Sequence, residues 1–209
     1  MKQLIIVGDG GHSQVIQDIA KANELTVVAI VDDLYDKPRH GAIVRAPFIM
    51  LEEMLVSYPN SVIVVAIGDN QIRKRIVDGI EIGEERYGTL IHPSAVIGTN
   101  VTIGVGTVVM ANAVLNARAT IGRHVIVNTG AIVEHDCCVG DFAHLSPQAA
   151  MAGAAKVDEG THLGTGSVLI PKVHVGAWTT VGAGAVATKH IPQRCTAVGV
   201  PARSIKSVD

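Results

Sequence analysis

The stretch VNTGAIVEHDCCVGDFAHLSPQAA, residues 127–150, places an aliphatic residue at every sixth position. The same frame runs from Ile91 to Val186, where sixteen consecutive hexads begin with Ile, Val, Leu or Met and carry mostly small residues at the fifth position. An α-helix cannot produce this pattern, because six residues turn it by about 600° and put successive aliphatic side chains on opposite faces. A parallel β-helix does, since each hexad forms one side and three hexads close a coil.

Sixteen hexads make a prism of a little over five coils, stacked about 4.8 Å apart. The two ends of such a prism are open sheet edges, and open edges need a cover. We therefore expect residues 91–186 to form the β-helix and residues 187–209 to form a C-terminal capping tail.

Residues 1–90 follow a different pattern. They alternate apolar runs with helical periodicity, which is typical of a small α/β domain of the β-α-β, Rossmann-like type with a parallel sheet. The predicted strands are 3–7, 26–31 and 61–68, and the predicted helices are 14–22 and 70–80. Ligands bind such sheets at the carboxyl ends of the strands, where residues 8–13, 32–33 and 68–70 fall.

The segment GDGGHS, residues 8–13, resembles the G-x-G-x-x-G dinucleotide fingerprint, with Ser13 in place of the third glycine. Glycines let the backbone approach a ligand, and the following helix N-terminus favours phosphate oxygens. Ninety residues leave no room for the double unit that holds a dinucleotide, so we expect a mononucleotide or a nucleotide-linked sugar; a plain tight turn is the alternative. His12 either contacts that ligand or caps the helix, and Asp32 and Asp33 either bind a sugar or are solvated.

Composition excludes several classes of function. A net charge of −2 and an aromatic content of 3% argue against nucleic-acid binding. The N-terminal apolar run is too short for a signal peptide and no segment is long enough to span a membrane, so we expect a cytoplasmic protein without membrane insertion. Cys137, Cys138 and Cys195 fit no disulfide or zinc pattern and are expected to be reduced thiols, with a catalytic Cys138 as an alternative to a wall residue.

Over nearly its full length the chain resembles the acetyl-CoA-dependent nucleotide-sugar N-acetyltransferases of the bacillosamine pathway and their sialic-acid O-acetyltransferase relatives. The resemblance is carried by GDGGH (8–12), VDD (31–33), AIGDNQIRK (66–74), IHPSAVIG (91–98), NTGAIVEHDCCVGDFAHLSP (128–147) and GVPA (199–202). It implies a left-handed parallel β-helix and a homotrimer with active sites between neighbouring prisms. Ala- and Val-rich hexads such as 109–114 (VMANAV) are also expected to expose flat apolar surfaces that a trimer would bury.

The same resemblance implies roles for individual residues. His135 matches the family's general base, and Asp136 matches a position usually held by Glu that raises the basicity of this histidine. Gly153 matches a backbone donor to the thioester oxygen. The resemblance further assigns His144, Thr165 and Ala183 to acetyl-CoA, Asn128 to the acceptor sugar, and Gly10, Gly11, His12, Asp32 and Asp33 to the nucleotide sugar.

The hexad frame predicts the orientation of His135 and the stacking of His144 on His162. His135 occupies a third position and should point outward, where it is either a base in a groove between subunits or an ordinary surface residue. His144 and His162 occupy sixth positions eighteen residues apart and should stack on successive coils. A metal pair there is conceivable, but none of the nine histidines has the ligand spacing of the γ-class carbonic anhydrases, so we expect no metal.

The expected function is therefore transfer of an acetyl group from acetyl-CoA to the amine of a nucleotide-linked 4-amino sugar, directly and with a histidine base. O-acetylation of a sialic acid or another sugar is an alternative within the same class of enzyme. A non-catalytic scaffold that binds a nucleotide sugar is an alternative from a different class.

Overall fold

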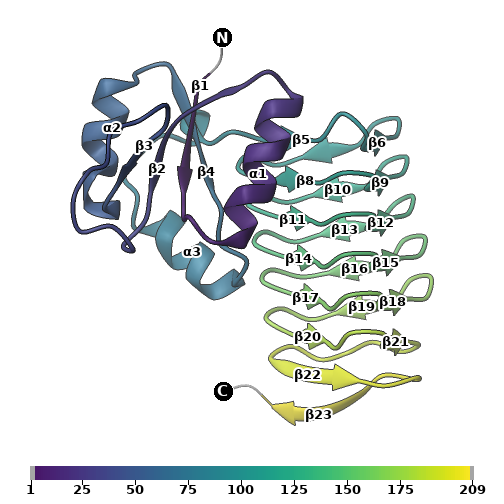
Figure 1. Ribbon diagram of the computed structural model, residues 1–209. Coiled ribbons are helices and arrows are strands. Elements are labelled where there is room, and N and C mark those ends of the chain that lie inside the picture. The colour runs from purple at the N-terminus through teal and green to yellow at the C-terminus, as the bar shows by residue number, and fades with distance from the viewer. Residues whose placement is uncertain (1–2, 208–209) are drawn as a thin grey trace. The chain divides into compact units, whose positions relative to one another are not determined.

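The computed structural model describes residues 3–207, and the chain divides into two compact units, residues 1–90 and residues 91–209. The first unit contains a four-stranded parallel sheet of order β3-β2-β1-β4 (Figure 1). Its elements are β1 (Gln3–Val7), α1 (Gly11–Ala22), β2 (Thr26–Val31), β3 (Val44–Ala46), the 3-10 turn η1 (Phe48–Met50), α2 (Leu51–Ser57), β4 (Ser61–Val65), α3 (Asn70–Asp78) and the 3-10 turn η2 (Glu84–Arg86).

The central strand β1 explains the sequence pattern of this unit. Leu4, Ile5 and Ile6 are all fully buried, because a parallel sheet is covered on both faces and needs apolar side chains on each. The three predicted strands and two predicted helices are present, although α1 begins at Gly11, inside the predicted turn. The strand predicted for 61–68 ends at Val65, and the helix predicted for 70–80 ends at Asp78. Sequence periodicity did not reveal β3 or α2, since three and seven residues are too few to show it.

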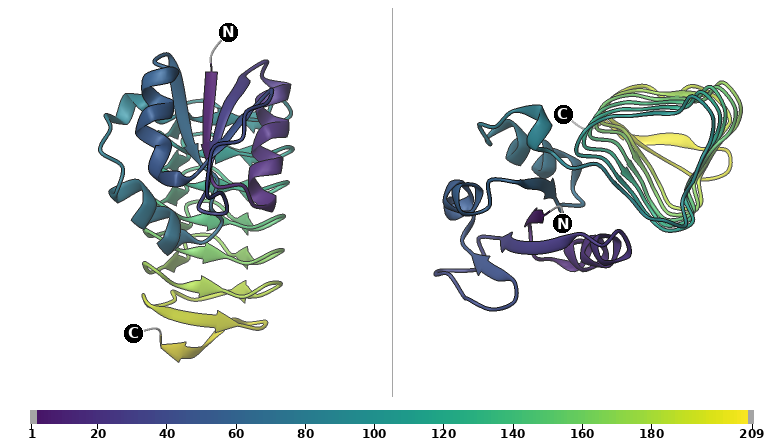
Figure 2. Two further views of the ribbon diagram at one scale, coloured as in Figure 1. Left: turned by 60° about the vertical axis from the view of Figure 1, so that its left-hand side comes forward. Right: turned by 90° about the horizontal axis from the view of Figure 1, so that it is seen from above.

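The second unit is a left-handed parallel β-helix, whose coils have a triangular outline when viewed along the stack (Figure 2). We number its faces in chain order. The first face contains β5 (Leu90–Ile91), β8 (Val108–Val109), β11 (Ile126–Val127), β14 (His144–Leu145), β17 (His162–Leu163) and β20 (Thr180–Val181). The second face contains β6 (Val96–Ile97), β9 (Val114–Leu115), β12 (Ile132–Val133), β15 (Ala150–Met151), β18 (Val168–Leu169) and β21 (Val186–Ala187). The third face contains β7 (Thr102–Ile103), β10 (Thr120–Ile121), β13 (Cys138–Val139), β16 (Lys156–Val157) and β19 (His174–Val175).

The hexad frame translates directly into this structure. Each two-residue strand consists of the sixth residue of one hexad, which points outward, and the first residue of the next, which points inward. In β13, for example, Cys138 is exposed and Val139 is 3% exposed. Strands pair with those eighteen residues away, as Cys138 does with Lys156. The fifth residue of a hexad fills the inside of the turn, and Cys137 at such a position is fully buried.

The fourth residue of most hexads adopts a left-handed backbone, which the sequence pattern did not reveal. Asp136 has φ of 61° and Arg118 has φ of 63°. This conformation turns the chain sharply from one face of the prism to the next. Residues at fourth positions of successive coils therefore line up on the outside of the corners.

The expectation that the hexad VMANAV exposes an apolar surface holds only for its last residue. Val109 points inward and is fully buried, and Met110 is only 1% exposed, whereas Val114 at the sixth position is partly exposed. Val114 belongs to an outward apolar surface on the second face, where sixth positions form a continuous aliphatic ladder. Its members are Val96, Val114, Ile132, Ala150, Val168 and Val186.

The chain after the last hexad adds two strands to the first face. β22 (Cys195–Val198) pairs in parallel with β20, and β23 (Arg203–Ser207) pairs antiparallel with β22. The backbone groups of the last coil on this face thus gain hydrogen-bonding partners. Within residues 3–207, no helix has the length and apolar character needed to cross a membrane.

Candidate active site

The turn between β12 and β13, at the corner of the second and third faces, carries His135 and Asp136. The His135 side chain is 58% exposed, as its third position predicts, and its Nδ1 lies 2.8 Å from Oδ2 of Asp136. When the neutral imidazole donates from Nδ1–H to the carboxylate, the lone pair remains on Nε2. Within residues 3–207 this Nε2 has no hydrogen-bonding partner, so it is available to a substrate.

Gly153 lies one coil further along the same corner, against the ring of His135. A Cβ built at position 153 would stand 2.7 Å from His135 Nε2 and 2.8 Å from Cε1. A side chain at position 153 would therefore displace the imidazole ring of His135, and glycine avoids this conflict. The Gly153 amide donates no hydrogen bond to any residue of the described part of the chain, so an N–H donor lies free beside the histidine.

Arg118 lies one coil before Asp136 and is a member of this cluster that the sequence analysis missed. Its Nε is 2.7 Å from Oδ1 of Asp136, and its Nη2 is 2.9 Å from Oδ2. The hydrogen bond from Arg118, and then the one from His135, hold the pKa of Asp136 well below its usual range. The available signal was the spacing of eighteen residues between two fourth positions, which puts Arg118 and Asp136 on successive coils.

The residues assigned to acetyl-CoA lie elsewhere on the prism. Thr165 and Ala183 are exposed third positions in turns between the first and second faces. Asn128 lies at the same corner, and its Nδ2 is 3.1 Å from Nε2 of His144 on the first face. The rings of His144 and His162 stack at 4.9 Å between centroids, as the hexad frame predicted.

One protomer therefore does not bring all the expected β-helix residues together. The group of His135, Asp136 and Gly153 lies at the corner between the second and third faces. The group of Asn128, Thr165 and Ala183 lies at the corner between the first and second faces. The whole width of the second face separates the two groups within a single prism.

In the first unit, Gly10 and Gly11 form the start of α1, at the carboxyl end of β1. A Cβ at either position would meet no atom within 4 Å, so open space surrounds this backbone. Gly10 caps the helix without any side-chain hydrogen bond. The free N–H groups of the first turn, together with the helix dipole, favour an anion there.

His12 lies in the first turn of α1 and is largely buried. Burial, and then the positive charge of Arg73, lower its pKa to about 4, so the ring is neutral near pH 7. Its Nε2 is buried without a hydrogen-bonding partner in the described structure. A buried, unpaired ring nitrogen beside the glycine turn fits the expected contact with a ligand better than a helix cap.

Asp32 has a structural part in the turn that bears the glycines. Its Oδ2 accepts a hydrogen bond of 2.7 Å from the amide of Asp9, and its Oδ1 accepts one of 2.7 Å from the amide of Leu34. The carboxylate thereby ties the end of β1 to the end of β2. The neighbouring Asp33 is exposed and has no hydrogen-bonding partner within residues 3–207, so it is the freer of the two acids to meet a sugar.

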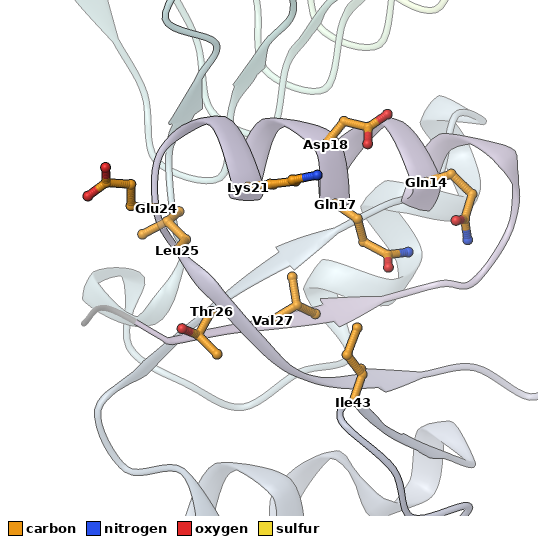
Figure 3. A pocket seen from close by; sticks show the side chains of 9 residues that line it. All are labelled: Gln14, Gln17, Asp18, Lys21, Glu24, Leu25, Thr26, Val27 and Ile43. Atoms are coloured by element: carbon orange, nitrogen blue, oxygen red, sulfur yellow. The ribbon is translucent and has the colours of Figure 1, made fainter.

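One depression in the first unit lies away from the expected site residues. It has a volume of about 720 Å³ and is open along one side of α1 and β2 (Figure 3). Gln14, Gln17, Asp18, Lys21, Glu24, Leu25, Thr26, Val27 and Ile43 line it. None of the expected site residues is among them, so the depression does not mark the expected site. Among the described residues, no cluster of three or more His, Cys, Asp or Glu side chains could hold a metal ion.

Comparisons with known proteins agree with this architecture. Residues 3–80 match the PglD N-terminal domain family. Over 108 residues the chain is 42% identical to UDP-N-acetylbacillosamine N-acetyltransferase of Bacillus subtilis (strain 168). This match covers 51% of the chain and 50% of the length of that relative. PerB from Caulobacter crescentus, solved in complex with CoA and GDP-perosamine, is 39% identical over 99% of this chain and 98% of its own, with a TM-score of 0.89.

The chain belongs to the family of nucleotide-sugar N-acetyltransferases that the bacillosamine-pathway enzymes represent. The acetyltransferase domain of PglB from Neisseria gonorrhoeae FA1090 has the same fold, with 35% identity, a TM-score of 0.88 and coverage of 98% of this chain and 100% of that domain. Membership in this acetyltransferase family gives the His135 corner a chemical context, since a free imidazole nitrogen beside a free amide suits acyl transfer.

Proposed function

We propose that the protein transfers an acetyl group from acetyl-CoA to the 4-amino group of a nucleotide-linked sugar. The observation that carries the proposal is the arrangement of His135, whose Nδ1 is held by Asp136 while its Nε2 is open. An imidazole held in this way can accept a proton at Nε2. The complexes of PerB with CoA and GDP-perosamine, and of the PglB domain with acetyl-CoA, support this choice of substrates.

The reaction needs one base and one donor to an oxyanion. The amine nitrogen attacks the thioester carbonyl carbon, forming the C–N bond, while negative charge develops on the carbonyl oxygen. His135 Nε2 takes the proton that the nitrogen loses, and the Gly153 N–H donates to the carbonyl oxygen. The C–S bond then breaks, and the sulfur of CoA leaves as a thiolate that takes up a proton. Asp136 favours the protonated imidazole through its negative charge.

The two co-substrates occupy different surfaces in this proposal. Thr165 and Ala183 line the path of acetyl-CoA with His144, because small exposed side chains leave room for the thin pantetheine arm. Asn128 lies beside His144 and faces the acceptor sugar. In the first unit, Gly10, Gly11 and His12 bind the nucleotide sugar with Asp33, while Asp32 mainly shapes the turn.

We further propose that the active protein is a homotrimer in which the three second faces surround the axis. The exposed aliphatic ladder on this face, with Val96 56% and Ile132 38% exposed, gives the contact an apolar surface to bury. Around a three-fold axis, the corner that bears His135 in one protomer meets the corner that bears Thr165 in the next. This packing joins the two groups that a single prism keeps apart.

We propose the cytoplasm as the place of action. Acetyl-CoA and nucleotide-linked sugars are both cytoplasmic metabolites, and the proposed reaction needs both. Cys137, Cys138 and Cys195 are free thiols in the structure, which fits a reducing compartment.

The test is to incubate the protein with acetyl-CoA and two panels of acceptors, UDP- and GDP-linked 4-amino sugars and hydroxyl-bearing sugars that include a sialic acid, and to follow the release of free thiol. We expect at least one amino sugar to give CoA well above background and an N-acetylated product by mass spectrometry. Turnover only with hydroxyl acceptors identifies an O-acetyltransferase. A thermal shift with a nucleotide sugar but none with acetyl-CoA, without turnover, identifies a binding scaffold.

A further inference from the structure

The ion pair between Arg118 and Asp136 has a geometry that surface pairs seldom hold. Arg118 directs two nitrogens at the two oxygens of one carboxylate, at 2.7 Å and 2.9 Å. Oδ2 of Asp136 therefore accepts from Arg118 and, at 2.8 Å, from His135. Arg118, Asp136 and His135 form a continuous chain of charge-assisted hydrogen bonds that spans two coils.

This pair contributes little to folding. The side chains of Arg118 and Asp136 are 61% and 40% exposed, and exposed pairs are worth little because water and salt screen them. Its effect on geometry is larger. An aspartate side chain rotates freely about χ1 and χ2 in solvent, whereas a two-point contact with a planar guanidinium fixes the plane of the carboxylate.

We propose that Arg118 is a positioning residue of the acetyl-transfer site, a role that rests on the function proposed above. By holding both oxygens of Asp136, it keeps Oδ2 at a distance of 2.8 Å from Nδ1 of His135. The proton of the neutral ring then stays on Nδ1, and the lone pair stays on Nε2, beside Gly153. Arg118 acts through Asp136 and touches no reacting atom.

The same β-helix contains a matched control at another corner. Arg123 and Asp141 are also eighteen residues apart on successive coils, and Nη2 of Arg123 is 3.0 Å from Oδ2 of Asp141. Their side chains are 50% and 31% exposed, which is close to the exposure of the first pair. Among the described residues, no histidine donates to Asp141, whose carboxylate accepts a hydrogen bond from the backbone N–H of Arg123 instead.

The experiment compares Arg118→Met, Arg118→Lys and Arg123→Met with the wild-type chain. Steady-state rates are measured with acetyl-CoA and the best amino-sugar acceptor. We expect Arg118→Met to lower kcat by roughly three- to tenfold, about the effect of one partly screened charged contact, with both KM values unchanged. Arg118→Lys should recover part of this loss, because ammonium supplies the charge without the two-point fork. Arg123→Met should keep the wild-type kcat.

A second readout does not depend on turnover. Nitrogen-15 NMR of the histidine side chains reports which ring nitrogen carries the proton, and the His135 signals are those missing from His135→Ala. We expect the Nδ1–H form in the wild-type protein and in Arg123→Met, and a mixture of the two tautomers in Arg118→Met. If the wild-type protein acetylates no acceptor, the proposed function fails, while the NMR comparison still decides whether Arg118 orients His135.

Three results overturn the inference. One is an Arg118→Met protein with both the wild-type kcat and the wild-type tautomer. Another is a raised KM for acetyl-CoA at unchanged kcat, which makes Arg118 a contact to the substrate. The third is a fall in kcat with an unchanged His135 tautomer, which means that Arg118 acts on the rate by another route.

Discussion

The ring of His135 and the backbone of Gly153 are packed so closely that a methyl group at position 153 would stand 2.7 Å from Nε2. The two residues are eighteen positions apart, on adjacent coils of one corner. The backbone of Gly153 does not have a positive φ, so an alanine there would conflict with the position of the ring and not with the dihedral angles. The imidazole of His135 can therefore keep its position only while residue 153 has no side chain.

Replacing Gly153 by alanine should displace the imidazole and slow the reaction. We expect Gly153→Ala to lower kcat by about ten- to a hundredfold, because a base moved by an ångström loses its alignment with the acceptor nitrogen. The ring is exposed and can move, so the melting temperature should change little. In a His135→Ala background the same substitution should cost much less, and an equal cost in both backgrounds contradicts the steric explanation.

Replacing His135 by alanine tests the base directly. We expect turnover to fall by roughly a hundred- to ten-thousandfold, the range for loss of a general base, with a melting temperature close to that of the wild-type protein. The matched control is His174→Ala, since His174 is 46% exposed and its Nε2 lies 2.9 Å from Oδ2 of Asp158. Near-normal turnover in His135→Ala with normal acetyl-CoA binding would show that the base lies elsewhere.

Replacing Asp136 by asparagine should have a smaller effect than removing His135. The carboxylate is ionised throughout the assay range, because Arg118 and His135 hold the pKa of Asp136 far below it. Asparagine can still accept a hydrogen bond from Nδ1 of His135, but it has no negative charge to stabilise the imidazolium that forms as the base takes up its proton. Turnover should therefore fall but remain measurable. Wild-type turnover, or a loss as large as that of His135→Ala, argues against this electrostatic role.

The lowered pKa of His12 predicts that the free energy of unfolding falls on mild acidification. Its pKa falls from 6.5 to about 4 on folding, so the unfolded chain binds a proton that the folded chain resists. The contribution of this group is complete above pH 6.5 and is lost as the pH falls towards 4, by about 3 kcal/mol in all. Urea unfolding between pH 6.5 and 4.5 should show a shallower decline for His12→Asn than for the wild-type protein. The exposed His40 gives a control, His40→Asn, whose decline should match the wild type.

The exposed aliphatic ladder on the second face predicts that the protein is a trimer in solution. Light scattering at micromolar concentration should give three times the mass of the 21.8 kDa chain. Ile132→Asp places a charge on the aliphatic ladder and should yield monomers with little turnover, because each site needs two protomers. Thr120→Asp, at an outward position of the third face, should remain trimeric. A monomeric wild-type protein excludes the proposed assembly.

The hexad pattern determined the β-helix without help from the structure. A period of six with an aliphatic first residue and a small fifth residue has one physical solution, in which those positions point inward along stacked coils. The outward direction of His135 and the stacking of His144 on His162 followed from the same frame, since both depend only on position within a hexad. In the first unit, runs of buried aliphatic residues were enough to place the main strands.

The tertiary structure decided which outward residues are partners. Arg118, Asp136, His135 and Gly153 are distributed over three coils, and only the exact stacking of those coils puts two nitrogens on one carboxylate and a ring over one glycine. The period says that residues eighteen apart are neighbours, but hydrogen bonds depend on the side-chain torsions, which the period leaves free. For the same reason the buried, unpaired Nε2 of His12 became visible only in the folded chain.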